Sequence, residues 1–166
     1  GLTHGGFYAH FDSREALVIE AFAYAMDRSM EHWRKISGEV SPEKRLALIA
    51  ETYLSALHRD NPGHGCSIPA LGAEIARESP KTRKAFAGKL DEMIEMMTDY
   101  IPNLPRKAAR KQAIATLATM AGTMLLARIA GSSELSDEVL KAGRDSALDG
   151  AKREPKVAAV KKAKQS

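Results

Sequence analysis

The first residues of the chain include several side chains that can donate hydrogen bonds to phosphate groups. Tyr8, His10 and Arg14 follow one another closely, and phenol, imidazole and guanidinium groups commonly contact the DNA backbone. Thr3 can cap a very short helix before them, although two glycines give that helix a low propensity. From the residues alone, the segment predicts either a phosphate-contacting element or an ordinary corner between two helices.

A second group of reactive side chains lies around a Pro-Gly turn. It contains His58, Asp60, His64 and Cys66, all of types that bind metals. The spacing matches none of the usual zinc motifs, and the chain has no second cysteine to pair with the first. We therefore expect no metal site here, and a solvated loop between two helices instead.

Cys66 is the single cysteine of the chain, so no intrachain disulfide can form. It lies directly before a predicted helix, and the positive end of a helix dipole lowers the pKa of a thiol. This position makes Cys66 a candidate redox sensor. The alternative is a small apolar side chain packed beneath the loop, which is the commoner role of a free cysteine.

The sequence contains no recognisable catalytic set. It has no glycine-rich phosphate loop, no His-Glu-x-x-His motif and no serine nucleophile elbow. We therefore expect no enzymatic activity, no catalytic residues, no metal and no cofactor.

The elements that position these residues are predicted to be helices throughout. Alanine is abundant and valine is scarce, which favours helix over sheet. Apolar residues recur at helical spacing between capping residues. The helix over residues 106–130 is apolar on every face beyond Ala113, so it must be covered on more than one side. The expected helices span residues 14–35, 42–58, 68–77, 80–101, 106–130 and 137–151.

The net charge of +4 is concentrated at the end of the chain. Residues 151–166 contain six Lys or Arg and one Glu, while the other residues carry 19 basic and 20 acidic side chains. We expect residues 152–166 to be a basic disordered tail, and the alternative is a non-specific phosphate contact. The sequence shows no signal peptide and no apolar run of about 20 residues. We therefore expect a cytoplasmic protein with no membrane partner.

Residues 1–17 carry a pattern that resembles the second half of the helix-turn-helix of TetR-family transcriptional repressors. The matching residues are Gly1, Leu2, Thr3, Phe7, Tyr8, His10, Phe11, Ser13, Arg14, Glu15 and Leu17. The resemblance implies an all-α, TetR-like fold, in which a partial helix-turn-helix precedes a helical ligand-binding and dimerisation domain. The implied division is residues 1–20 as a remnant of the DNA-binding domain, residues 21–151 as the effector and dimerisation domain, and the tail 152–166.

The same resemblance implies that this segment contacts operator DNA in the full-length protein. Tyr8 and His10 match phosphate-contacting positions, and Arg14 matches the basic residue that opens the next helix. His4 has the only hydrogen-bonding side chain among the positions that face base edges, so we expect DNA shape to contribute to recognition. The implied DNA-binding set is Thr3, His4, Gly5, Gly6, Tyr8, Ala9, His10 and Arg14.

The sequence departs from the family pattern at its start. Family members carry further helices before this motif, whereas the sequence opens at the motif itself. We therefore expect DNA binding to belong to the full-length protein, which we interpret as a ligand-responsive DNA-binding regulator and a repressor. The alternative is a helical ligand-binding and dimerisation module with no DNA role in this truncated form.

A cluster of methionines could line a ligand cavity together with Trp33, Tyr53, Phe86 and Tyr100. Methionines at helical spacing are more often ordinary core. In the family the equivalent helices enclose an effector pocket, so the resemblance makes this cluster a candidate ligand-binding site. The expected effector is small and mostly apolar or aromatic, because the lining holds few charges. The candidate residues are Tyr53, Phe86, Met93, Met97, Thr116, Met120 and Met124.

The last two predicted helices are expected to form a homodimer interface, as the family resemblance implies. Residues 106–130 and 136–151 of two copies would make a four-helix bundle. Ala118, Ala121 and Gly122 are small enough to allow close helix approach.

Overall fold

The computed structural model describes residues 11–152, and for residue 64 and residues 148–152 the backbone alone. Within these residues the chain forms seven α-helices and one short 3-10 helix, η1, with no strand. In chain order they are α2 (Arg14–Gly38), α3 (Pro42–Tyr53), α4 (Ala56–Asp60), η1 (Pro62–His64), α5 (Ser67–Ile75), α6 (Pro80–Asp99), α7 (Arg106–Ile129) and α8 (Glu134–Lys152). The predicted all-helical fold is confirmed.

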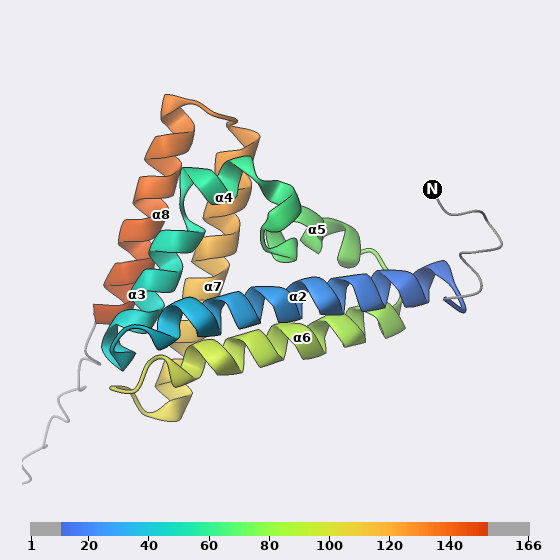
Figure 1. The fold of residues 1–166 in the computed structure, drawn as a ribbon, viewed down its shortest axis with the longest axis horizontal. Helices are drawn as coiled ribbons and strands as arrows, with labels where there is room; N and C mark the ends of the chain where they lie inside the picture. Colours follow the sequence, from blue (N-terminus) through green and yellow to red (C-terminus); the bar gives the residue numbers. More distant parts are fainter. Residues whose placement is uncertain (1–10, 153–166) are drawn as a thin grey trace, which may run out of the picture.

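The long helices form two groups that meet at an angle (Figure 1). α2 and α6 lie side by side along one edge of the molecule. α7 and α8 rise from one end of this pair, with α3 packed against both α2 and α8. α4 and α5 lie in the angle between the two groups. Trp33, toward the end of α2, contacts Tyr53, the last residue of α3.

Capping residues begin and end helices where the sequence predicts. The Ser13 hydroxyl accepts a hydrogen bond from the backbone N–H of Ala16 at 3.0 Å and so begins α2. The Ser79 hydroxyl likewise accepts from the N–H of Thr82 at 3.2 Å and begins α6. Gly131 follows α7 with a φ of 67°, a left-handed conformation that favours glycine.

The helix expected over residues 42–58 is instead divided in two. α3 ends at Tyr53, and the Ser55 hydroxyl accepts from the N–H of His58 at 3.2 Å to begin α4. The prediction of one continuous helix was wrong, because a serine that caps a new helix competes with continuation of the apolar stripe. As a result Leu57 is 76% exposed.

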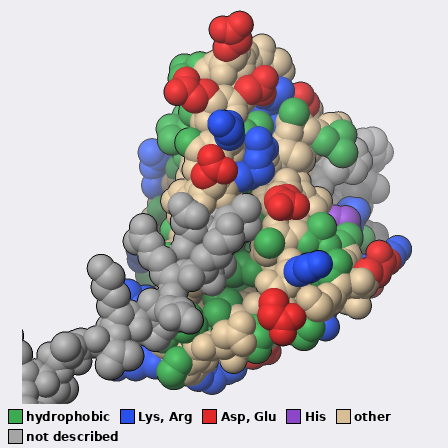
Figure 2. Space-filling view, turned by 90° about the vertical axis from the view of Figure 1, so that its left-hand side faces the viewer, with side chains coloured by type: hydrophobic (Ala, Val, Ile, Leu, Met, Phe, Trp, Pro, Cys, Tyr) green, Lys and Arg blue, Asp and Glu red, His purple; other side chains and the backbone are tan. Residues whose placement is uncertain are grey.

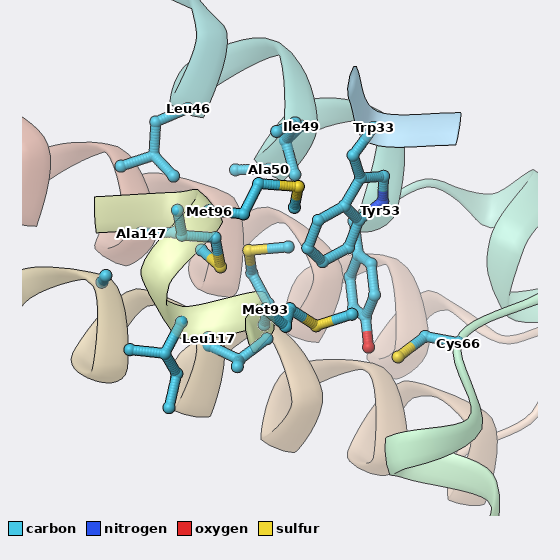
Figure 3. Close-up of a cluster of buried hydrophobic side chains, with 14 of the residues drawn as sticks. Trp33, Leu46, Ile49, Ala50, Tyr53, Cys66, Met93, Met96, Leu117 and Ala147 are labelled. Atoms are coloured by element: carbon cyan, nitrogen blue, oxygen red, sulfur yellow. The ribbon is translucent and has the colours of Figure 1, made fainter. Parts of the chain in front are cut away.

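One hydrophobic core connects the long helices. Its centre is a set of fully buried methionines, whose unbranched side chains fill irregular space well. They are Met26, Met30, Met93, Met97, Met120 and Met124. Figure 3 shows part of this core, with Trp33 and Tyr53 lying between the methionines and Cys66. Core packing therefore accounts for the helical spacing of the methionines.

By length and composition, α7 could cross a membrane, with a mean hydropathy of 1.3 over its most apolar stretch. The expectation that no segment is long and apolar enough to span a membrane needs correction. That expectation considered only stretches without charged residues, whereas α7 contains charged residues near its two ends. In the structure α7 packs against α4, α5, α6 and α8 and buries seven of its residues. The core helix of a soluble protein meets the same criterion of length and composition.

Gly143 marks a close approach of α8 to α7. A Cβ atom added there would lie 2.7 Å from the Cβ of Thr123, which is well inside normal contact distance. Gly143→Ala should therefore destabilise the fold by an overpacking cost of about 1–3 kcal/mol. Melting followed by circular dichroism measures this loss.

Gly88→Ala on α6 is the matched control for this substitution. No atom lies within 4 Å of its added Cβ, and alanine favours helix over glycine. This variant should melt at or above the temperature of the parent. Equal melting temperatures of Gly143→Ala and Gly88→Ala would contradict the observed packing of α8 on α7.

Candidate functional site

A cavity of about 400 Å³ opens beside α2, at the point where α3 ends. Its other walls are α4, η1 and the turn that leads into α5. Its volume is typical of small-molecule sites. The lining residues are Tyr24, Ala25, Arg28, Ser29, His32, Trp33, Thr52, Tyr53, Ser55, Leu57, His58, Asn61, Gly63, Gly65 and Cys66.

Aromatic rings form the buried part of this cavity. The rings of Trp33 and Tyr53 meet edge to face with centroids 5.8 Å apart, and Tyr53 meets the His58 ring at 4.5 Å. The Tyr53 hydroxyl has no nitrogen or oxygen partner among the described residues, and it points toward the thiol of Cys66 (Figure 3). Burial raises the pKa of Tyr53 well above its ordinary value, so the hydroxyl stays protonated.

Two backbone groups fix the ring of His58. Its Nδ1 lies 2.7 Å from the carbonyl oxygen of Tyr53, and its Nε2 lies 3.1 Å from the backbone nitrogen of Cys66. Because the carbonyl can only accept and the N–H can only donate, the proton of the ring is on Nδ1. Burial lowers the pKa of His58, in agreement with a neutral ring. No group of three or more metal-ligating side chains gathers within the part of the chain that is described.

Cys66 is only 3% exposed and lies directly before the first residue of α5. Burial raises the pKa of its thiol and outweighs the hydrogen bonds with the Ile68 backbone and the Tyr53 hydroxyl, which lower it. The expectation that the helix end lowers this pKa was therefore wrong, because desolvation of the thiolate dominates. A redox-sensing role for Cys66 stays a prediction.

Two arginines hold α4 against the turn between α7 and α8. Arg59 is 8% exposed and donates to the Ser136 hydroxyl at 3.0 Å and to the Asp137 carboxylate at 2.8 Å. Arg128 donates to the carbonyl oxygen of His58 at 3.0 Å and to that of Arg59 at 3.3 Å. The short helix beside the cavity is thus tied to the end of α7 and the start of α8.

The sequence reasoning missed both arginines and, apart from Trp33, the residues that α2 contributes to the cavity. Arg128 ends a long run without charged residues, which was a usable signal for a cation held by specific partners. Nothing in the sequence indicated the role of Arg59, whose partners on α8 lie 77 and 78 residues further along.

Of the predicted ligand-binding residues, the structure places only Tyr53 in the cavity wall. The other six lie in the core: Met93, Met97, Met120 and Met124 are 0% exposed, Thr116 is 1% and Phe86 is 6% exposed. Contact between these six residues and a ligand stays a prediction. The cavity that the structure presents is lined by a different set.

The predicted DNA-binding residues 3–10 lie outside the described part of the chain, and so does most of the basic tail. Arg14 is exposed at the first position of α2. The neighbouring carboxylate of Glu15 accepts hydrogen bonds from the hydroxyls of Ser79 and Thr82, the latter at 2.7 Å. These bonds lower the pKa of Glu15 and tie the start of α2 to the start of α6.

The buried state of His58 predicts a pH dependence of stability. Because the pKa of His58 is lowered on folding, the unfolded chain binds the proton first as pH falls below the ordinary value of 6.5. The contribution of the neutral ring is fully present well above that value and is lost as pH falls toward the lowered pKa of the folded state. Thermal stability should therefore begin to fall at about pH 7.5 and decline most steeply below pH 6.5. His58→Gln cannot take up this proton and should flatten the profile.

His32→Gln is the matched control, because His32 is exposed on α2 and borders the same cavity. Its melting profile against pH should keep the slope of the parent protein. If His58→Gln retains the full slope, another group is responsible for it.

Comparison with known proteins places this arrangement in a family. Residues 42–141 match the family model described as "Transcriptional regulator LmrA/YxaF-like, C-terminal domain". The crystal structure of E. coli NemR in its reduced form has a similar fold, with a TM-score of 0.69 and 21% identity over 87% of this chain and 79% of that chain. No curated protein matches the sequence significantly. The chain belongs to the TetR family of transcriptional regulators, which are not enzymes, and carries a C-terminal domain of the LmrA/YxaF-like type.

Proposed function

We propose that the chain is a ligand-responsive DNA-binding repressor of the cytoplasm, with the cavity beside α2 as its effector site. The observation that carries the proposal is that α2 forms one wall of the cavity and also follows directly the segment that resembles a recognition helix. We keep the proposed division into a DNA-binding remnant (residues 1–20), an effector and dimerisation domain (residues 21–151) and a basic tail (residues 152–166). Operator DNA, a small effector and a second copy of the chain are the proposed partners.

The path from cavity to DNA runs along α2. A ligand in the cavity contacts residues 24–33, from the middle of this helix into its second half, and the helix begins at Arg14, which follows the proposed DNA contacts in the sequence. The hydrogen bonds between Glu15 and the start of α6 make the two helices move together at that end. A ligand releases DNA only if it binds the non-binding arrangement more tightly than the binding one.

An exposed apolar stripe on α7 supports the proposed homodimer. On one face of α7, exposed residues recur at helical spacing, and none of the described helices covers this face. They are Ile114, Ala118, Gly122, Leu125 and Ile129, of which Ile129 is 73% exposed. Leu135 continues the apolar surface onto α8 and is 60% exposed. Single exposed leucines are ordinary, but a stripe of this length is typical of an interface. Residues 106–130 and 136–151 therefore remain the proposed interface.

The visible charges on the face that includes α8 do not favour contact between this face and DNA. Figure 2 shows that acidic and basic side chains are interspersed over the face that includes α8, without a patch of one sign. Binding to phosphates needs clustered basic groups. We therefore assign DNA contact to the residues around Tyr8 and His10.

A second candidate function is a helical ligand-binding and dimerisation module that has no DNA role. The match of the family model to a C-terminal domain alone favours it. DNA binding by the complete gene product separates the two candidates.

The complete gene product should bind a palindromic operator with half-sites about one helical turn apart. Tyr8→Phe and His10→Ala should weaken binding to all sequences, because they remove proposed phosphate contacts. His4→Ala should instead change the preferred base at one position of each half-site. Fluorescence anisotropy with a panel of operator variants measures both effects, and absence of any DNA binding would favour the second candidate.

Gly122→Glu should convert the proposed dimer into a monomer. No atom lies within 4 Å of an added Cβ at Gly122, so the fold of one chain tolerates the change, whereas a carboxylate in an apolar interface does not. Gly88→Glu on α6 has the same free space and is the matched control. Light scattering should report a monomer for the first variant and a dimer for the second. A dimer from both would place the interface elsewhere.

A further inference from the structure

We infer that the cavity beside α2 binds a small aromatic molecule that carries one anionic group such as a carboxylate. This inference rests on the proposed function, in which the cavity is the effector site, and it adds the chemical class of the ligand. It also replaces the mostly apolar effector expected from the methionines with one that has a defined charge.

Among the described residues that line the cavity, the single charged side chain is the cationic Arg28. Arg28 and His32 lie on successive turns of α2 along the cavity wall, and no Asp or Glu is among the lining residues. Asp27, the acidic neighbour of Arg28, is paired with Lys89 of α6 at 2.8 Å. Arg28 forms no ion pair among the described residues, and its guanidinium lies 5.9 Å from the ring of Tyr24. A guanidinium without a carboxylate partner at the mouth of a cavity is suited to an anion.

The buried part of the cavity is suited to an aromatic ring. Trp33 is 5% exposed and Tyr53 is 3% exposed, so their rings form a fixed apolar surface. Aromatic pairs favour edge-to-face or offset contacts, and Trp33 and Tyr53 already adopt the first of these. A ligand ring that enters the cavity would extend this arrangement.

The ring nitrogens of His58 are both used by backbone groups, so His58 offers no free donor to a ligand. The Tyr53 hydroxyl has no nitrogen or oxygen partner among the described residues and donates only to the sulfur of Cys66. Sulfur is a weak acceptor, so a ligand oxygen that accepts from this hydroxyl would replace a weak hydrogen bond with a stronger one. We therefore expect the preferred ligand to carry a second, neutral acceptor at the end remote from its anionic group.

The volume of about 400 Å³ limits the ligand to one or two rings. The order of the lining residues along α2 places Arg28 and His32 before Trp33, so the anionic group and the ring contact the same helix. Such a ligand would contact α2 at two points, with its anionic group at Arg28 and with its ring at Trp33.

The test compares three probes of nearly equal shape with the 166-residue chain: 3-phenylpropanoate, the neutral 3-phenylpropanamide and the cationic 3-phenylpropylamine. Titration calorimetry gives the affinities. Trp33 is the single tryptophan of the chain, so a change in its emission locates binding at the cavity. The carboxylate should bind about tenfold more tightly than the amide, the amine should bind weakest, and only bound probes should change the emission of Trp33.

Arg28→Gln should remove the preference for the carboxylate over the amide without weakening the amide. Arg34→Gln is the matched control, since Arg34 is exposed on the same helix and does not line the cavity; it should keep the full preference. Equal affinity for carboxylate and amide in the parent protein, or a preference that survives Arg28→Gln, would overturn the anionic class. Failure of all three probes to bind would overturn the cavity as an aromatic site.

Failure of the proposed function has a different signature. A complete gene product that binds no DNA, yet binds the carboxylate with the expected preference, would remove the repressor assignment and leave the ligand class in place. A gene product that binds DNA but prefers the amide would keep the DNA-binding assignment and overturn the anionic ligand class.

Discussion

The cavity depends on a buried cation at the junction of α4 with α7 and α8. Arg59 is nearly removed from water, and a buried guanidinium is tolerated only where hydrogen-bonding and charged partners surround it. Ser136 and Asp137 supply them from the start of α8, and Asp60 from the next position in the chain. A continuous helix over residues 42–58, which the apolar pattern favours, would carry Arg59 away from these partners. The junction therefore fixes the break after Tyr53, and the break leaves the space beside α2.

His58 belongs to both the cavity and this junction. Its ring connects Tyr53 to Cys66 on the cavity side, while its carbonyl oxygen accepts from Arg128 of α7 on the other. A ligand that moves the ring of Tyr53 must therefore disturb a residue that is bonded to α7. The same cavity is bounded directly by α2, whereas α7 is reached only through the hydrogen bond between Arg128 and the His58 carbonyl oxygen. Coupling between ligand and DNA needs two arrangements of these helices with different affinities for the ligand.

Local signals in the sequence predicted most of the fold. Ser13 and Ser79 cap helices, and Gly131 ends one, because each acts on backbone groups within a few residues of itself. The candidate site was harder to predict, because its partners are distant in sequence. The hydrogen bond between Arg59 and Ser136 joins residues 77 positions apart, so the helical periodicity of the sequence does not predict it. The pKa direction of Cys66 was missed because the helix end is a local feature, whereas burial is set by the whole fold. Apart from Trp33, the residues of α2 at the cavity were missed, because the sequence pattern shows which residues share a helix face but not which element packs against that face.

The central claim is that the effector site is the cavity between α2 and the α3–α4 break, rather than the methionine core. A crystal structure of the chain grown with 3-phenylpropanoate tests it most directly. We expect electron density for the phenyl ring against Trp33 and Tyr53, with the carboxylate within hydrogen-bond distance of Arg28. Density among Met93, Met97 and Met124, with the cavity beside α2 filled only by solvent, would contradict it.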